Sequence, residues 1–489
     1  MSSSNRTQVL TVRESTLGTT PGTPRMRTLR LTGESLSYQP IYVDSDEIRA
    51  DRMMGDPILA MTESQGGINF EVSYPDDNSP LSDLYRSAFY NTWVNTPQRD
   101  NDGTADSVIT GIATAGEVAT VVTASDAFVA SQLVKFSGFT VAGNNGVFKC
   151  TTGSATVPAF VGSGITDEAA PPAAAKMKVV GFIGAAGDIT AAAGGLASTL
   201  LDFTTLGLAV GQWIKIGGTA AGDKFANIAV DNGWARITAI AANALTLDNK
   251  PTGWDADNGA TKTIKVWFGD QIKNGTTQTS LSIEKGFLDQ TTPTYIINTG
   301  MVVDTMSHNM ASRAKIGGSV AFKGMGGSAG TTALDASPDA VTTGLVMAAN
   351  ANVGRLGIDG TALISPNWGK SIEFTINNNN RVLDSIDSQS PVGVNMGECL
   401  VTGKFETYFG SLGELTKLYN NTATAINARV TKNSQALIFQ IPRAQYRGGG
   451  NPAASGKNVD VMVTMDFQAS EDTTTSAHVL LDRVPYFEA

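Results

Sequence analysis

Apolar and polar positions alternate along several short stretches of the chain, which is the pattern of half-buried β-strands. The first clear case is 67–74, where Ile68, Phe70 and Val72 alternate with polar neighbours. Similar strand patterns follow at 279–285, 295–300, 316–322, 399–409, 425–430, 436–441 and 459–467. We therefore predict a mainly β protein built from packed antiparallel sheets.

Residues 80–93 have the periodicity of an amphipathic helix instead. Ser79 suits the N-cap and Pro80 suits the first helical position. The apolar residues that then share one face are Leu81, Leu84, Tyr85, Ala88 and Phe89. A second helix candidate spans 412–419. Such faces are expected to pack against the sheets.

Residues 1–40 are polar, rich in Thr, Ser and Pro, and show no helical period. We predict an extended arm that is ordered only on assembly.

The composition changes between about 101 and 273, where Ala, Gly, Thr and Val dominate and aromatic residues are few. Three pairs of short segments match inside this region: 132–138 with 212–218, 145–146 with 232–233, and 177–179 with 264–266. The first pair lies 80 residues apart and the other two lie 87 apart, so a longer loop in the second copy reconciles them. We infer two tandem inserted β domains, 103–183 and 184–272.

The flanking regions repeat one order of elements, a strand, a helix and three further strands. We predict an internal duplication in which 1–100 plus 274–330 form a first, discontinuous domain and 331–489 form a second. The alternative is one enlarged domain.

The 489 residues carry a formal net charge of −10. Acidity argues against a surface that grips nucleic acid, because phosphate binding needs clustered Lys and Arg. It is compatible with a surface past which DNA slides, but charge alone favours plain solubility. Cys150 and Cys399 are too few for a disulfide framework, which favours a reducing compartment. The N-terminus lacks the apolar core of a signal peptide, and no run reaches the roughly 18 apolar residues of a membrane span.

The sequence motifs that would indicate catalysis, metal binding or nucleotide binding are incomplete. His308 and His478 are the only histidines, so His-rich metal sites and Ser-His-acid hydrolases lack their parts. Residues 369–371 (Gly-Lys-Ser) imitate the end of a P-loop, but Ile364 replaces the required Gly and an alternating strand follows. The Gly-Met-Gly of 324–326 lacks the third Gly of a dinucleotide fingerprint.

Two acidic segments have alternative interpretations. The Asp-Ala-Asp-Asn-Gly of 255–259 hints at a calcium loop, but Ala260 and Val266 stand where Gly and Glu belong, which favours a plain turn. Asp44, Asp46 and Glu47 form either a solvated loop or part of a surface whose like charge keeps DNA from binding. We therefore expect no catalytic residue, cofactor or metal.

The flanking segments, in their order, resemble the major tail tube proteins of long-tailed, siphophage-type bacteriophages. The segments that carry the resemblance are 43–52, 66–72, 282–287 with Tyr295 and Gly300, 371–378, 391–409 and 441–443. The resemblance covers roughly half of the chain, and the order is more specific than any single piece.

The resemblance implies a tail tube fold, in which packed sheets with a flanking helix close into rings around a lumen. Stacked rings would then conduct genomic DNA into the host, without catalytic residues. It also implies location in the virion tail after assembly in the host bacterial cytoplasm. The implied partners are copies of the chain, a tape-measure protein, and tail terminator and baseplate proteins. The insert departs from this pattern and resembles the decorating β modules of tail proteins.

Three expectations follow from this interpretation. The insert points outward, so replacing 103–272 with a linker leaves tube assembly intact. Carboxylates outnumber Lys and Arg in the lumen. The duplicated chain closes as a homotrimer with pseudo-sixfold symmetry, in preference to a homohexamer.

Two other classes of protein would show different sequence features. A capsid or decoration protein would show a long spine helix and a charged, scaffold-like N-terminus. A β-modular adhesin that binds cell-surface glycans would show a signal peptide or repeats running to the end of the chain. The sequence shows neither set.

Overall fold

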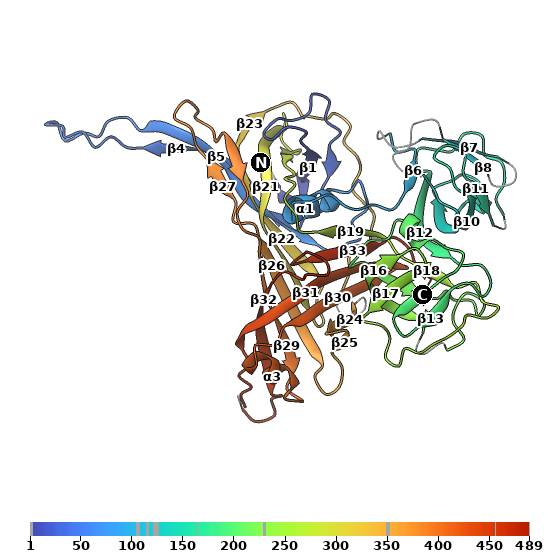
Figure 1. The fold of residues 1–489 in the computed structure, drawn as a ribbon. Helices are drawn as coiled ribbons and strands as arrows, with labels where there is room; N and C mark the ends of the chain where they lie inside the picture. Colours follow the sequence, from blue (N-terminus) through green and yellow to red (C-terminus); the bar gives the residue numbers. More distant parts are fainter. Residues whose placement is uncertain are drawn as a thin grey trace.

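The computed structural model describes residues 3–103, 108–113, 117–120, 127–162, 164–227, 231–348, 353–454 and 456–488. Its strands form an 18-stranded sheet, a 13-stranded sheet and a two-stranded ribbon, and the strand pairs are antiparallel (Figure 1). Two α-helices lie in this described part. The prediction of a mainly β protein with large antiparallel sheets is confirmed.

The large sheet takes its strands from both sides of the insert. The strands before the insert are β1 (Thr7–Arg13), β2 (Arg27–Thr28), β3 (Gly33–Glu34), β4 (Ser37–Val43) and β5 (Ile58–Glu71), preceded by the 3-10 helix η1 (Ser4–Arg6) and followed by α1 (Pro80–Phe89). Directly after it come β19 (Asp270–Lys273), β20 (Leu281–Phe287), β21 (Thr294–Ala311), β22 (Gly317–Gly324) and β23 (Gly326–Gly330). The last set is β24 (Val353–Ile358), β25 (Thr361–Ala362), β26 (Gly369–Asn377), β29 (Leu400–Tyr408), α3 (Gly413–Tyr419), β30 (Thr424–Lys432), β31 (Gln435–Gly449), β32 (Met462–Ala469) and β33 (Leu480–Val484). The small ribbon is β27 (Arg381–Leu383) with β28 (Gly393–Asn395).

Helix α1 begins where the sequence predicts, because the Ser79 hydroxyl accepts a hydrogen bond from the Ser82 amide and Pro80 occupies the first turn. The predicted end at residue 93 was wrong. The helix stops at Phe89 because Tyr90 adopts a left-handed conformation with φ of 50° and caps the last turn.

The N-terminal segment is part of the sheet. Strand β1 pairs with β20 along its whole length, from Thr7 opposite Phe287 to Arg13 opposite Leu281, and Val9 is buried. The prediction of an arm ordered only on assembly was wrong. Thr and Val suit a strand even where the overall composition is polar.

The two parts of the large sheet show the same strand pairings. We call β1–β5, α1 and β20–β23 the first half, and β24–β26, α3 and β29–β33 the second half. Strand β21 pairs with β20, β22 and β23, as β31 pairs with β30, β32 and β33. Likewise β22 pairs with β5 as β32 pairs with β29, and β1 pairs with β20 as β24 pairs with β30. Finally, β4 pairs with β5 as β26 pairs with β29.

The irregularities of these pairings also correspond. Strand β21 shifts register against β22 between Val303 and Thr305, and β31 shifts against β32 between Tyr446 and Gly448. A β-bulge is a specific feature of a strand, so its repetition aligns the two halves residue by residue. Thr305 thus corresponds to Gly448.

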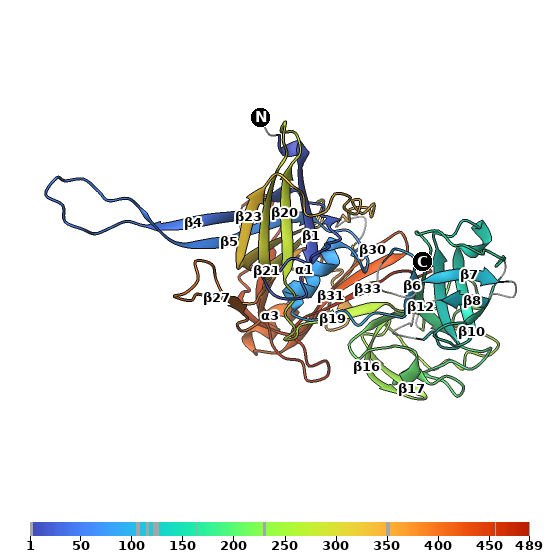
Figure 2. The same cartoon turned by 90° about the horizontal axis from the view of Figure 1, so that it is seen from above.

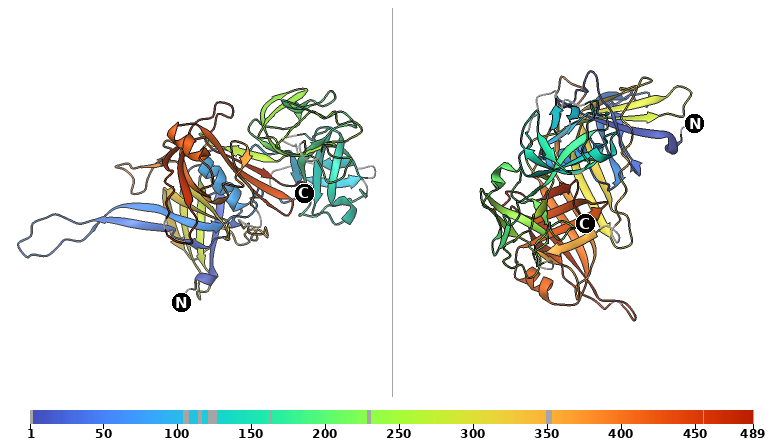
Figure 3. Two further views of the ribbon diagram at one scale, coloured as in Figure 1. Left: turned by 90° about the horizontal axis from the view of Figure 1, so that it is seen from below. Right: turned by 90° about the vertical axis from the view of Figure 1, so that its right-hand side faces the viewer.

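The insert forms the 13-stranded sheet. Its elements are β6 (Gln98–Asp100), β7 (Ile109–Ala113), β8 (Glu117–Thr120), β9 (Gln132–Ser137), η2 (Ala142–Asn144), β10 (Gly146–Thr152), β11 (Ala159–Val161), β12 (Lys176–Ile183), β13 (Thr190–Ala192), β14 (Gly195–Ala197), η3 (Phe203–Thr205), β15 (Trp213–Ile216), β16 (Gly233–Ala241), β17 (Ala244–Asp248) and β18 (Lys265–Trp267). It lies on the opposite side of the large sheet from the projecting β4–β5 hairpin (Figures 1 and 2, and the left view of Figure 3).

Matched residues of the insert make matched hydrogen bonds. The Gln132 side chain accepts from the Val129 amide, as the Gln212 side chain accepts from the Ala209 amide. Asn145 bonds both backbone groups of Phe139, and Asn232 does the same with Phe225. Such pairs are expected of tandem copies; the boundaries 103–183 and 184–272 stay a prediction. Strand β19, at the end of the second span, pairs with β33 of the large sheet.

Candidate assembly surfaces

Eight consecutive strands of the large sheet form one continuous ribbon. Their order is β4, β5, β22, β21, β26, β29, β32 and β31. Four strands come from each half, so the ribbon crosses from the first half to the second between β21 and β26. We call these strands the eight-strand ribbon. Its two edges are β4 and the C-terminal end of β31.

The eight-strand ribbon has one apolar and one polar face, because side chains alternate along each strand. The apolar face packs into the main core, and its members include Ile68, Phe70, Val320, Phe322, Met306, Met310, Ile372, Phe374, Phe405, Met465 and Phe467. The opposite face is polar and at least partly exposed: Gln65, Asn69, Thr305, Ser307, Ser319, Ala321, Glu373, Thr375, Thr402, Lys404, Thr464, Asp466 and Gln468.

Lysines on the polar face are held by carboxylates. Lys404 lies 2.8 Å from Glu373, and the hydrogen bond between them raises the pKa of Lys404. Lys370 lies 3.3 Å from Glu406 across the same strand pair. On the first half, Lys323 lies 3.7 Å from Asp304. Exposed pairs of this kind stabilise the fold little. Their effect is to reduce the positive potential of this face.

The junction between the halves is fixed by side chains as well as by strand pairing. Seven residue pairs join β21 to β26, from Thr305 opposite Asn377 to Ala311 opposite Ser371. Asn378 donates its side-chain amide to two backbone carbonyls, those of Ala88 and Val303. A buried side-chain amide that donates to two backbone carbonyls in this way fixes a single register.

His308 lies in the core behind this junction. Its ring stacks on Tyr85 of α1 at 5.6 Å between centroids and contacts Phe70 of the first half. It also contacts Phe374 and Phe439 of the second half. Burial lowers the pKa of His308 to about 3, so the imidazole is neutral at pH 7.

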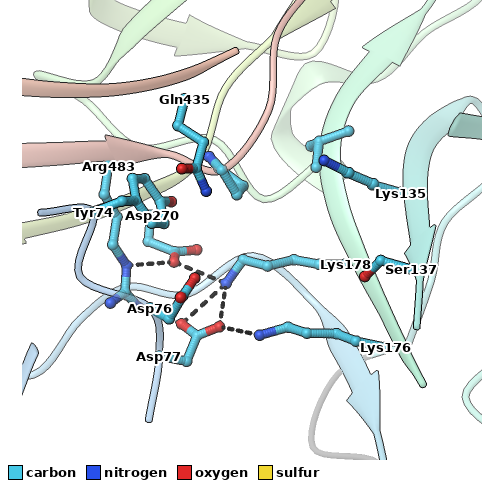
Figure 4. A pocket seen from close by; sticks show the side chains of 12 residues that line it. Tyr74, Asp76, Asp77, Lys135, Ser137, Lys176, Lys178, Asp270, Gln435 and Arg483 are labelled. Carbon is cyan, nitrogen blue, oxygen red and sulfur yellow. Dashed lines mark hydrogen bonds and ion pairs between the residues drawn. The ribbon is translucent and has the colours of Figure 1, made fainter. Parts of the chain in front are cut away.

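A buried ion cluster joins the insert to the large sheet (Figure 4). Lys178 of β12 lies 2.8 Å from both Asp77 and Asp270. Arg483 of β33 donates to the same two carboxylates, with 2.7 Å to Asp270, and Lys176 lies 3.1 Å from Asp77. Burial raises the pKa of Asp77, but the surrounding cations outweigh it and hold the pKa well below its usual value. The pocket beside the cluster measures about 120 Å³.

A second joint lies next to this cluster. The Trp213 indole of the insert donates to Gln440, and Gln440 in turn donates to Asp482. Asp482 also accepts from Gln271 and from the Trp213 backbone amide. Burial raises the pKa of Asp482 to about 8 despite these donors. An apolar contact completes the joint, formed by Leu133, Val180 and Trp267 with Ala436, Val484 and Phe487. The insert is therefore docked firmly.

The segments singled out from sequence lie apart from one another. Asp44, Asp46 and Glu47 are exposed in the tip of the β4–β5 hairpin. The Asp257 carboxylate accepts from the amides of Ala226, Asn227 and Gly259, so the segment at 255–259 is a turn built on side-chain hydrogen bonds.

The other motifs also take ordinary places. Residues 369–371 begin strand β26, where a phosphate-binding loop cannot form. Cys150 and Cys399 are both free thiols, and burial raises the pKa of each to about 11.

Sequence reasoning missed the ion cluster and the edges of the eight-strand ribbon. The cluster draws on segments as far apart as Asp77 and Arg483, and no spacing connects them. One usable signal was the run of glycines at 448–450, which marks the edge of β31.

An open-edged sheet with one polar face is typical of a subunit that assembles with copies of itself. A model of the family described as phage tail tube protein matches the chain twice, over residues 4–239 and 175–469. These matches cover well over half of the chain, which therefore belongs to the phage tail tube protein family. It is a structural component of the virion tail that assembles into a tube. A search of curated proteins found no match.

None of the helices in the described ranges is both long enough and apolar enough to cross a membrane.

Proposed function

We propose that the chain forms stacked homotrimeric rings with pseudo-sixfold symmetry, whose lumen conducts double-stranded DNA during ejection from a long, non-contractile siphophage-type tail. The observation that carries this proposal is the repeated set of strand pairings in the two halves. Each half then acts as one tail tube domain, 1–100 plus 274–330 and 331–489, with two further β domains inserted in the first. The family model matches the chain twice, as a duplicated chain would give, although the matched spans overlap and do not follow these boundaries.

The dimensions of the eight-strand ribbon suit a DNA channel. Three chains would supply 24 strands, and at about 4.8 Å per strand the circumference is roughly 115 Å. The backbone diameter is then about 37 Å for untilted strands and larger with tilt. That space admits a hydrated duplex and the side chains of the wall.

The polar face would line this channel, because the core and α1 cover the opposite face. Lysines that already contact carboxylates offer little to DNA phosphates, so the duplex slides without the counterion release that strengthens binding. The role is mechanical, and we propose no catalytic residue, metal or cofactor. The expected partners are copies of the chain, a tape-measure protein, and terminator and baseplate proteins met in the host bacterial cytoplasm.

Cryo-electron microscopy of the purified, assembled protein tests the proposal. We expect tubes with three chains per ring, six similar density lobes around the lumen, and more carboxylates than Lys and Arg on the inner wall. Rings of six chains with one tube domain each would overturn the duplication. A continuously positive inner wall would overturn the sliding mechanism, and closed shells would indicate a capsid protein instead.

A further inference from the structure

The intrachain junction is a template for the contact between chains. Closing the eight-strand ribbon requires its β31 edge to meet the β4 edge of the next copy. Inside the chain, β21 meets β26, and these strands correspond to β31 and to the β3–β4 segment. The repeated bulges make the correspondence specific to single residues.

The correspondence can be followed on both sides of the junction. On one side, Thr305 corresponds to Gly448, because both directly follow the bulge and lie opposite Ala321 and Asp466 respectively. On the other side, Phe322 lies opposite Gly66 as Phe467 lies opposite Gly403. This match aligns β5 with β29.

The neighbouring strand follows from that alignment. Thr375 of β26 lies opposite Thr402, and Ser37 of β4 lies opposite Gln65, the residue that corresponds to Thr402. Ser37 therefore corresponds to Thr375, and Gln39 corresponds to Asn377.

On the basis of the proposed ring, we propose that β4 of one subunit pairs antiparallel with the C-terminal end of β31 and the following Gly450 in the next subunit, with Gln39 opposite Gly448. This pair is the image of Asn377 opposite Thr305 within the chain. By the same register, Tyr38 lies opposite Gly449 and Ser37 lies opposite Gly450.

Both edges are open in the isolated chain. Within the described residues, β4 pairs with β5 alone and Gln39 is exposed. The end of β31 pairs with β32 on one side, and its pairing with β30 stops at Ala444. Open strand edges pair with other strands unless they are blocked.

Glycines are required at the β31 edge, because a Cβ at Gly449 would clash with the Thr464 carbonyl of β32. Gly449 and Gly450 have φ of 78° and 65°, where other residues are strained, and Gly448 is half-exposed on the polar face. The copy contact also differs from its template. Asn378 donates its backbone amide to the Asp304 carbonyl, whereas Pro40 at the corresponding position has no amide hydrogen.

Paired cysteines test the register in assembled tubes. The background carries Cys150→Ala and Cys399→Ala, and the test variant adds Gln39→Cys and Gly448→Cys. Opposed residues of antiparallel strands lie about 4.5–5.5 Å apart between Cα atoms, within disulfide range. Thr305→Cys with Asn377→Cys is the matched control, because it should form the equivalent disulfide inside one chain. Pro40→Cys with Gly448→Cys is one residue out of register, so its thiols lie on opposite faces.

We expect oxidation of the test variant to give covalent dimers and trimers on denaturing gels, while the matched control stays monomeric and oxidised and the out-of-register pair stays unlinked. Tubes in which the control links and the Gln39–Gly448 pair does not would overturn the register and leave the proposed function standing. If the variants do not assemble, a map of the unmodified tube decides, because β4 must lie beside Gly448 of the neighbour. Failure of the unmodified protein to form any ring would overturn the proposed function and this contact with it.

Discussion

Replacing Lys178 with Met should destabilise the subunit far more than a single surface lysine would. The ammonium group is buried and contacts both Asp77 and Asp270 at 2.8 Å. Removing one partner of a buried ion pair typically costs about 3–5 kcal/mol, because a charge is left uncompensated. Arg483 and Lys176 remain beside the carboxylates, so we expect the lower end, about 3 kcal/mol.

That free energy converts into a measurable shift. For 489 residues the unfolding entropy is about 1 kcal/mol per degree, so the loss lowers Tm by about 3 °C if the chain melts as one unit. Separate melting of the insert would make the shift larger for the smaller unit. Differential scanning calorimetry of the unassembled subunit measures this directly.

The matched control is Lys404→Met, which removes an exposed lysine that lies 2.8 Å from Glu373. Exposed pairs contribute at most about 1 kcal/mol, so its Tm should fall by 1 °C or less. Lys178→Arg keeps the charge and should recover part of the loss. Equal shifts for Lys178→Met and Lys404→Met would refute the view that the buried cluster holds the insert in place.

Two further predictions concern acid stability and the insert. The pKa of His308 is about 3 when folded and near 6.5 when unfolded, so stability should fall as pH drops from 6.5 towards 3, by up to about 1.4 kcal/mol per pH unit. His308→Phe should flatten the dependence of Tm on pH between 6.5 and 4, and an unchanged slope for this variant would contradict the prediction. Replacing 98–268 with a short Gly/Ser linker should preserve tubes of normal ring diameter, because Val94 and Gln271 already pair and hold the ends together. This version keeps β19, which the span 103–272 would remove, and a soluble, folded deletion protein without tubes under the microscope would show that the insert belongs to the wall.

Local sequence patterns predicted helices and strands well where they depend on residues with a clear conformational preference. The alternation at 67–74 lies mainly within β5, and the Ser79–Pro80 start of α1 is confirmed. The end of α1 was missed because it depends on the backbone of Tyr90, a residue with no preference for the left-handed region. Strand β31 runs beyond the predicted 441 to Gly449, since Arg443, Gln445 and Arg447 alternate with buried residues.

The surfaces were harder to predict, because they depend on pairing between distant segments. The matches inside the insert were visible, since residues such as Asn145 and Asn232 hold the same turn by the same bonds. The register of β21 against β26 was not visible. It depends in part on the hydrogen bond that the Asn378 side chain donates to the Ala88 carbonyl, and nothing in the sequence links two residues so far apart.

The two junctions of the proposed ring have different chemistry, and the difference follows from duplication. Inside the chain, Asn378 and Asn380 add side-chain bonds to the β21–β26 pairing. At the edge between copies, the corresponding positions hold Pro40 and Tyr42, which have no side-chain amide. The covalent connection holds the halves at high effective concentration, so the internal junction forms on folding. The external junction has fewer bonds. Its formation is then the step that depends on protein concentration and on neighbouring rings. We therefore expect the subunit to fold before its open edges pair with a neighbour.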